Sequence, residues 1–317
     1  MVPTTRSTSS LAIWSALAAV YVIWGSTYLA IAITVQTLPP LLSAGLRFCV
    51  AGVVLLGIVA VRRGLHVGRQ QLVGAAVVGL LLLVGGNGFV VLAERTVPSG
   101  LTALIIASVP LWIVIFRRIA GDRIHASTFI GVAVGFAGVA FLVVPRGSGG
   151  GVDVGGLALL LVATVSWAVG TFLAPRLAMP RDSLLSTGIQ QLAGGVVLLV
   201  SGAAVGELGR LEPASWSVNS LLALAYLVVF GSLIAFTAYS WLLQNAPVSL
   251  VATYAYVNPV VAVVLGALVL AEPITGSIVF GAAIIVAAVA FIVTREGARQ
   301  RAARLPAPPR SAASEAD

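Results

Sequence analysis

Long runs of apolar residues, separated by short polar segments, fill the chain from residue 11 to residue 294. Each run holds roughly 19 to 27 residues, and at about 1.5 Å per residue a helix of that length crosses a hydrocarbon core of about 30 Å. We therefore predict an all-α integral membrane protein with ten transmembrane helices. They are expected over 11–33, 40–61, 71–93, 98–116, 126–144, 154–174, 184–206, 216–242, 247–271 and 274–294.

The composition supports this prediction and excludes several classes of protein. Hydrophobic residues make up 59% of the chain and charged residues only 9%, whereas about a quarter of a soluble chain is charged. All 18 basic residues are arginines, so the lysine of an ATP-binding P-loop or a Schiff-base enzyme is missing. One cysteine, Cys49, and two histidines, His66 and His125, offer neither a disulfide nor a typical metal site. No cofactor, no metal and no enzymatic activity are expected.

Arginine placement predicts the orientation, because basic residues near span ends are retained in the cytoplasm. With ten spans both termini share one side, and fourteen arginines then fall on that side against three on the other. The exceptions are Arg95, Arg146 and Arg210 outside, and Arg47 within a span. We predict a multi-pass protein of the cytoplasmic membrane with both termini cytoplasmic. Its expected partners are lipids and a small solute, without nucleic acid, and the chain is expected to be monomeric.

The chain also contains an internal repeat. Residues 41–56 match residues 184–199 at nine of sixteen positions, at a shift of 143 that also places Trp24 on Trp167. Shifts of 149 and 150 place Pro110 on Pro259 and Gly131 on Gly281. The predicted organisation is a leader (1–10), a first repeat (11–144), a Gly-rich linker (145–153), a second repeat (154–294) and a disordered, cytoplasmic Arg- and Pro-rich tail (295–317).

Each repeat holds an odd number of spans, so the two halves run through the membrane in opposite directions. Inverted repeats let one central site open to either face, which is the geometry of alternating access. The repeat thus favours a transporter. A channel or scaffold protein, or an integral-membrane transferase, are the alternatives, although the spans lack the paired carboxylates, histidine or lysine that a transferase needs.

Several motifs, in order along the chain, carry a family resemblance. They are WGSTYLA at 24–30, PP at 39–40, GLRF at 45–48, YAYVNPVVA at 254–262 and AEP at 271–273. With them, nearly the whole chain resembles the EamA-type transporters of the drug/metabolite transporter superfamily. The resemblance implies two inverted five-helix EamA repeats, a cavity lined mainly by the first four helices of each, and export of amino acids or other small metabolites. The chain has Asp122 where the family often has Glu, and no role is transferred to it.

Polar side chains in hydrocarbon are costly, so the few present are candidates for the solute pathway. Arg47 is the one charged residue within a predicted span, and it either reaches toward the interface or binds a solute carboxylate. Other candidates are aromatic or amide side chains, for which ordinary helix packing is the competing interpretation. They are Trp24, Thr27, Tyr28, Asn87, Trp112, Trp167, Thr171, Tyr239, Tyr254 and Asn258.

Pro110 and Pro259 are matched prolines near mid-membrane. Each removes a backbone hydrogen bond to the carbonyl four residues earlier, so each is expected to act as a hinge or as a plain kink. Glu94 and Glu272 lie only at span ends and are expected to face outward, so no carboxylate is predicted at mid-span. Facilitated transport or exchange is therefore the predicted mode, with proton antiport through one of these glutamates as the alternative.

Overall fold

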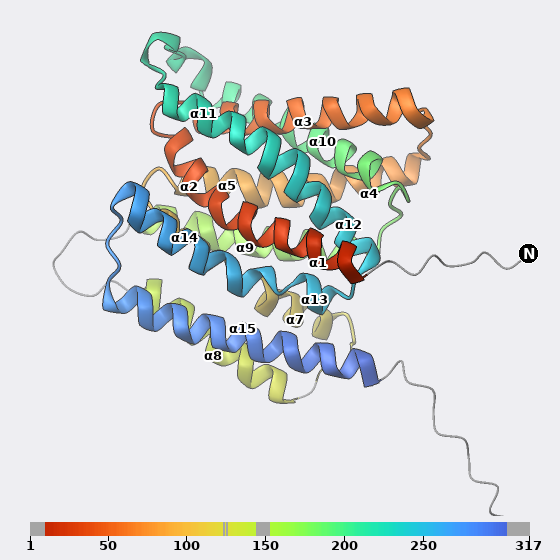
Figure 1. Cartoon of the computed structure of the whole chain (residues 1–317), viewed down its shortest axis with the longest axis vertical. Coiled ribbons are helices and arrows are strands. Elements are labelled where there is room, and N and C mark those ends of the chain that lie inside the picture. Colours follow the sequence, from red (N-terminus) through yellow and green to blue (C-terminus); the bar gives the residue numbers. More distant parts are fainter. Residues whose placement is uncertain (1–9, 123, 125, 144–152, 303–317) are drawn as a thin grey trace, which may run out of the picture.

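The computed structural model describes residues 10–122, 124, 126–143 and 153–302, and within these ranges the chain is helical with short connections (Figure 1). No β-strand occurs in the part of the chain so described. In lipid a chain must satisfy its backbone hydrogen bonds internally, and helices do so within one segment. The predicted all-α fold class is confirmed.

The first repeat consists of spans one to five. In order, these are α1 (Ser10–Ala19), η1 (Val20–Trp24) and α2 (Gly25–Thr34); α3 (Pro40–Arg63); α4 (Arg69–Gly79), η2 (Leu80–Gly88) and α5 (Phe89–Ala93); α6 (Ser99–Ile106) and α7 (Val109–Ile119); and α8 (Ala126–Val143).

The second repeat consists of spans six to ten, with two short 3₁₀ turns between the seventh and eighth. In order, these are α9 (Val154–Leu173); α10 (Ser183–Ala204); η3 (Glu207–Arg210) and η4 (Pro213–Ser215); α11 (Val218–Tyr226), η5 (Leu227–Phe236) and α12 (Thr237–Asn245); α13 (Val248–Val251) and α14 (Tyr254–Leu270); and α15 (Gly276–Ala302).

Eight of these spans are long and apolar enough to cross a membrane, and the fifth and ninth contribute shorter apolar helices, Thr128–Leu142 and Val257–Leu270. Together they give the ten helices predicted. One boundary prediction is wrong: α15 continues to Ala302, so the start of the predicted disordered tail is helical. Helix-favouring Arg, Ala and Glu there extend the last span beyond its apolar part. The remaining tail, the leader before Ser10 and the linker before Asp153 lie outside the described residues.

The fourth and ninth spans are interrupted. The fourth breaks at residues 107–108, and Pro110 stands in the first turn of α7. The ninth breaks at residues 252–253, whereas Pro259 lies inside α14. The matched prolines therefore do not produce matched breaks: only the first lies beside one. Shifting 252–253 by 149 gives residues 103–104, which are helical.

The first, third and eighth spans each contain a π-helical segment: η1, η2 and η5. A π-helical turn widens the helix by one residue and is frequent at functional sites. Here the three segments supply inner faces of the bundle, including Trp24, Asn87 and Phe236.

The second and seventh spans, α3 and α10, form the closest helix pair and run side by side in Figure 1. Their contact uses glycines that are repeat mates. A Cβ built on Gly52 would lie 2.8 Å from the backbone nitrogen of Leu192, and one on Gly195 would lie 2.7 Å from that of Cys49. The best-matched segment of the internal repeat is thus the segment in which the two halves touch.

The fifth and tenth spans, α8 and α15, pack against each other along one edge of the bundle (Figure 1). Neither contributes a residue to the central cavity described below. The other eight spans surround the centre of the molecule.

Candidate functional site

A small cavity lies at the centre of the bundle, between the two repeats. Its volume is about 50 Å³. The first repeat contributes spans one to four, and the second contributes spans six, eight and nine. Its wall is formed by Trp24, Thr27, Tyr28, Ile31, Arg47, Phe48, Leu83, Gly86, Asn87, Val90, Ile106, Ala163, Trp167, Phe236 and Tyr254.

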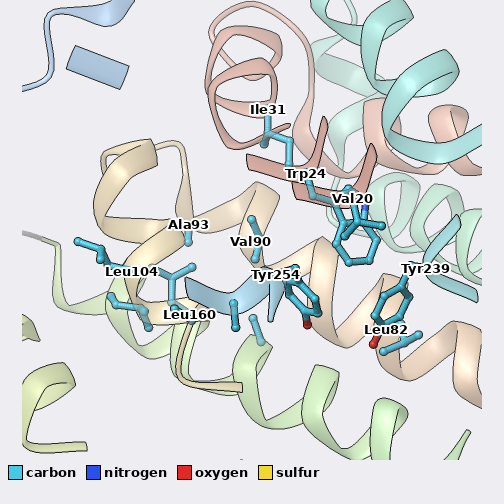
Figure 2. Close-up of a cluster of buried hydrophobic side chains, with 14 of the residues drawn as sticks. Val20, Trp24, Ile31, Leu82, Val90, Ala93, Leu104, Leu160, Tyr239 and Tyr254 are labelled. Atoms are coloured by element: carbon cyan, nitrogen blue, oxygen red, sulfur yellow. The ribbon is translucent and has the colours of Figure 1, made fainter. Parts of the chain in front are cut away.

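Aromatic rings form much of this wall. Trp24 and its repeat mate Trp167 meet edge to face with 5.5 Å between ring centroids. Trp24 also contacts Tyr239 at 4.7 Å and Tyr254 at 5.4 Å, and Figure 2 shows these three rings together. Such edge-on and tilted contacts are the favoured geometries of aromatic pairs. The cavity is therefore lined by rigid, largely apolar surfaces with few polar groups.

Arg47 is the cationic group of the cavity wall, and only 4% of it is exposed. Its Nε donates to Ser232 Oγ at 2.7 Å, and its Cζ lies 4.7 Å from the centre of the Phe48 ring. Its Nη1 is buried without any hydrogen-bond partner. A buried donor left unpaired costs about 1–3 kcal/mol, and more when it is charged. Nη1 is thus available to an anionic group that enters the cavity.

The other polar side chains at the cavity differ in whether their hydrogen-bonding atoms already have a partner. Asn87 Oδ1 is buried and has no partner, whereas the Thr27 hydroxyl donates to Trp24 O in its own helix at 2.7 Å. Thr171 and Tyr239 bond each other at 3.0 Å between hydroxyl oxygens, just outside the wall. Asn87 therefore offers a solute an acceptor, while the hydroxyls of Thr27 and Thr171 already have partners.

Besides Thr171 and Tyr239, two further candidates do not line the cavity. Trp112 packs on Phe136 at 4.9 Å between ring centroids. Asn258 is buried, and with its amide nitrogen turned toward them it donates to Tyr254 O at 3.3 Å and Tyr21 O at 3.1 Å. The contact with Tyr21 O joins α14 to η1. Asn258 therefore takes part in helix packing, which is the competing interpretation given above for the candidate side chains.

Several wall residues were not candidates in the sequence: Ile31, Phe48, Leu83, Gly86, Val90, Ile106, Ala163 and Phe236. Apolar residues of a transmembrane helix give no signal that separates a cavity from lipid or core. Gly86 is the exception, because a Cβ there would lie 2.7 Å from the Trp167 ring. A glycine pair beside an asparagine in a span indicates such a close approach.

The sequence is similar to that of a known family of membrane proteins. The model of the "EamA-like transporter family" matches residues 10–144 and again residues 154–294. The chain belongs to this family. It is 41% identical over 81% of its length to an uncharacterized inner membrane transporter of Escherichia coli K12, YedA, of which 82% is covered.

More distant relatives of this EamA-like transporter have similar names. The uncharacterized transporter YvbV of Bacillus subtilis is 29% identical over 90% of this chain and 93% of its own. A solved crystal structure that is 24% identical covers 92% of this chain and 99% of its own, with a TM-score of 0.62, and supports the fold. The function is transport across a membrane.

A second, larger cavity of about 360 Å³ lies toward the predicted cytoplasmic end of this transporter. Its wall includes Arg181, Ser240, Gln244 and Gln190, the repeat mate of Arg47. Leu82 lines it as well and packs beside Tyr239 and the aromatic cluster in Figure 2. The two matched positions of α3 and α10 thus face two different cavities.

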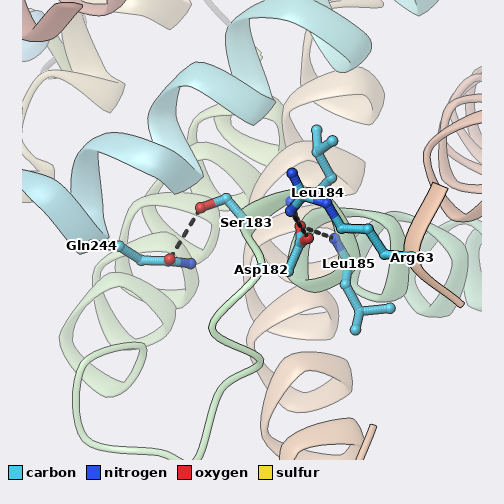
Figure 3. Close-up of polar contacts among 6 residues, drawn as sticks. All are labelled: Arg63, Asp182, Ser183, Leu184, Leu185 and Gln244. Carbon is cyan, nitrogen blue, oxygen red and sulfur yellow. Dashed lines mark hydrogen bonds and ion pairs between the residues drawn. The ribbon is translucent and has the colours of Figure 1, made fainter. Parts of the chain in front are cut away.

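Beside this cavity, polar contacts join neighbouring spans. Arg63 at the end of α3 pairs with Asp182 at 2.6 Å, and Asp182 accepts from the backbone nitrogens of Leu184 and Leu185 at the start of α10 (Figure 3). Ser183 Oγ donates to Gln244 Oε1 at 3.0 Å. The Arg63–Asp182 pair ties the first repeat to the second at this end.

At the opposite end, three acidic residues cap helix N-termini. Glu207 accepts from Leu41 and Leu42 of α3 at 3.1 and 2.8 Å. Glu272 accepts from Ser99 and Gly100 of α6 at 2.8 and 3.1 Å. Asp153 caps α9, and the Thr96 hydroxyl and then the amides of Gly155 and Gly156 lower the pKa of its carboxyl.

One expectation about the glutamates is wrong. Glu94 follows the third span directly, yet only 6% of it is exposed, and both carboxyl oxygens are buried without a partner. It therefore faces the interior of the bundle. Position at the end of an apolar run did not reveal this, because the burial of a side chain depends on the elements that pack around it and not on its place in the sequence.

Proposed function

We propose that this transporter exports small amphipathic metabolites such as amino acids by alternating access between its two inverted repeats. It acts in the cytoplasmic membrane as a monomer surrounded by lipid, with both termini in the cytoplasm. Arg47 carries the proposal. A buried guanidinium with an unpaired donor, in a cavity of aromatic walls, suits a solute that joins a carboxylate to an apolar side chain.

The proposed role of each residue in solute binding follows from the atoms that have no hydrogen-bond partner in the protein. Arg47 Nη1 would donate to the solute carboxylate, and Asn87 Oδ1 would accept from an ammonium group. Trp24, Trp167 and Tyr254 would contact the side chain. Ser232 holds the Arg47 head through Nε, so the guanidinium stays oriented without losing its free donor.

Alternating access is supported by the two cavities. Ligand pockets usually hold about 300–1,000 Å³, so a central cavity of about 50 Å³ is contracted in this conformation. The 360 Å³ cavity lies toward one end of the bundle. Rocking of the repeats would enlarge the centre and connect it to either end in turn, with the breaks in spans four and nine as hinges.

Counterflow in proteoliposomes tests this function. Vesicles loaded with unlabelled L-leucine, L-phenylalanine or L-threonine are diluted into the same labelled amino acid, with tetraphenylphosphonium as a cationic comparison. We expect transient, saturable accumulation of at least one amino acid and none of the cation, because Arg47 repels it. Uptake of the cation alone, or uptake that never saturates, would contradict the proposal.

A further inference from the structure

Glu94 has no role in the function proposed so far, yet it is the most unusual carboxylate of the described residues. It lies one helical turn beyond Val90, a residue of the cavity wall. Figure 2 shows Val90 and Ala93 of α5, and Val90 lies on the side of Tyr254 and the aromatic cluster. Its side chain is buried and neither oxygen accepts a hydrogen bond. A charged carboxylate in such surroundings is strongly disfavoured, and a protonated one is not.

Glu272 makes the contrast clear. Both of its oxygens accept from backbone amides at the N-terminus of α6, where the helix dipole also favours negative charge. Burial first, and then the negative charge of Glu272, raise the pKa of the Glu94 carboxyl. Carboxyls in unlike surroundings commonly take unlike roles in proton transfer.

Tyr28 on α2 interacts electrostatically with Glu94. The elements that pack on α5 carry further charged side chains, Arg47 on α3 and Asp153 directly before α9, and Arg95 follows Glu94 in the chain. Arg47 donates its Nε to Ser232, and Asp153 accepts from Thr96. Tyr28 both lines the cavity and interacts electrostatically with Glu94, so it connects the carboxyl to the solute pathway.

We propose that Glu94 is the proton-binding site of this transporter, and that each solute is exported in exchange for one proton. When the outer end opens, a proton from external water adds to one Glu94 oxygen. When the inner end opens, the same proton passes to water on the cytoplasmic side, and no other bond changes. The conformation that buries Glu94 has a central cavity too small for a solute. Proton and solute therefore occupy the transporter in turn, which favours exchange over movement of both together.

The first test needs no knowledge of the solute. Infrared difference spectra of the purified full-length protein in lipid, recorded between pH 7 and pH 10, should contain the carbonyl band of a buried protonated carboxyl. We expect Glu94→Gln to lose this band and Glu94→Asp to shift it. The matched control is Glu207→Gln, which removes a glutamate from the same end of the bundle whose oxygens are both hydrogen-bonded. A band that persists in Glu94→Gln would overturn the proposal.

The second test rests on the proposed function. Vesicles filled with labelled L-phenylalanine are diluted into buffer one pH unit more acidic or at equal pH. We expect the acidic exterior to accelerate efflux about tenfold in the wild type and in Glu207→Gln. In Glu94→Gln the acceleration by the acidic exterior should vanish. Glu94→Asp, which retains a titratable group, should restore part of the acceleration.

The two proposals fail in different ways. Absence of counterflow for every amino acid would reject the proposed function, and the infrared measurement would still decide whether Glu94 holds a proton. Counterflow that ignores the pH gradient in the wild type, or acceleration that survives in Glu94→Gln, would reject proton exchange and leave the transport function intact.

Discussion

Arg47 and Glu94 show how single residues acquire their properties from their surroundings. Both are buried polar side chains in an apolar bundle, and each leaves hydrogen-bonding atoms without a partner. The chain identifies Arg47 as unusual because it is the one charge within a span. It does not identify Glu94, which stands at the end of an apolar run like many interfacial glutamates.

We predict that Arg47→Gln lowers amino acid counterflow at least tenfold, a loss of about 1.4 kcal/mol or more of binding or transition-state stabilisation. Arg47→Lys should retain part of the activity, because it keeps the charge but loses the planar, multiply donating guanidinium. Arg62→Gln is the control, since Arg62 is exposed at the end of the same helix. Counterflow of Arg47→Gln equal to that of the control would remove Arg47 from the solute site.

At the scale of helices, glycines decide how closely the two repeats approach. The pair α3 and α10 meets through Gly45, Gly52, Gly188 and Gly195, where a Cβ would reach backbone or side-chain atoms of the facing helix at 2.7–3.0 Å. Small residues allow transmembrane helices to pack backbone against backbone. The strong sequence match between these segments follows from this geometry, because each helix meets the same constraint from the other.

Gly52→Ala should therefore destabilise the protein by about 1–3 kcal/mol, the usual cost of overpacking. Its Cβ would meet Leu192 N at 2.8 Å and Gly188 O at 3.0 Å, and backbone atoms cannot move aside easily. Gly57→Ala on the same helix has nothing within 4 Å and should be neutral or slightly stabilising. Thermal unfolding in detergent compares the two. Equal melting temperatures would show that α3 and α10 are less tightly packed.

Pro110→Ala addresses the hinge in the fourth span. Alanine restores a backbone donor and favours a continuous helix across residues 107–108. We expect the maximal rate of counterflow to fall several-fold while the half-saturating solute concentration changes little, since Pro110 does not line the cavity. Pro213→Ala, in the exposed 3₁₀ turn η4, is the control. An unchanged maximal rate would show that Pro110 is a plain kink.

For the whole molecule, orientation remains a prediction that depends on the arginine distribution. We expect both termini in the cytoplasm, residue 209 outside and residue 68 inside. In a Cys49→Ala background, an impermeant maleimide should label Gly209→Cys in intact cells and Gly68→Cys only after lysis. Both positions are exposed and have room for a side chain. The opposite pattern would reverse the orientation and with it the assignment of the larger cavity to the cytoplasm.

The sequence by itself determined the ten apolar helices and the two inverted repeats, because length, hydropathy and internal similarity are properties of the chain. It also indicated Trp24 and Trp167 as repeat mates and as candidates for the solute pathway, and these rings do meet. Apolar neighbours such as Phe236 and Val90 could not be separated from lipid-facing residues, because the bilayer removes the contrast between core and surface that soluble helices show.

Only the tertiary structure decided which polar atoms lack a partner. Whether a buried group is satisfied depends on residues far away in the chain: Ser232 for Arg47, and Ser99 and Gly100 for Glu272. The break before Tyr254, away from Pro259, likewise became visible only in the fold. Proline removes a hydrogen bond at a known position, but that position does not by itself fix where the helix breaks.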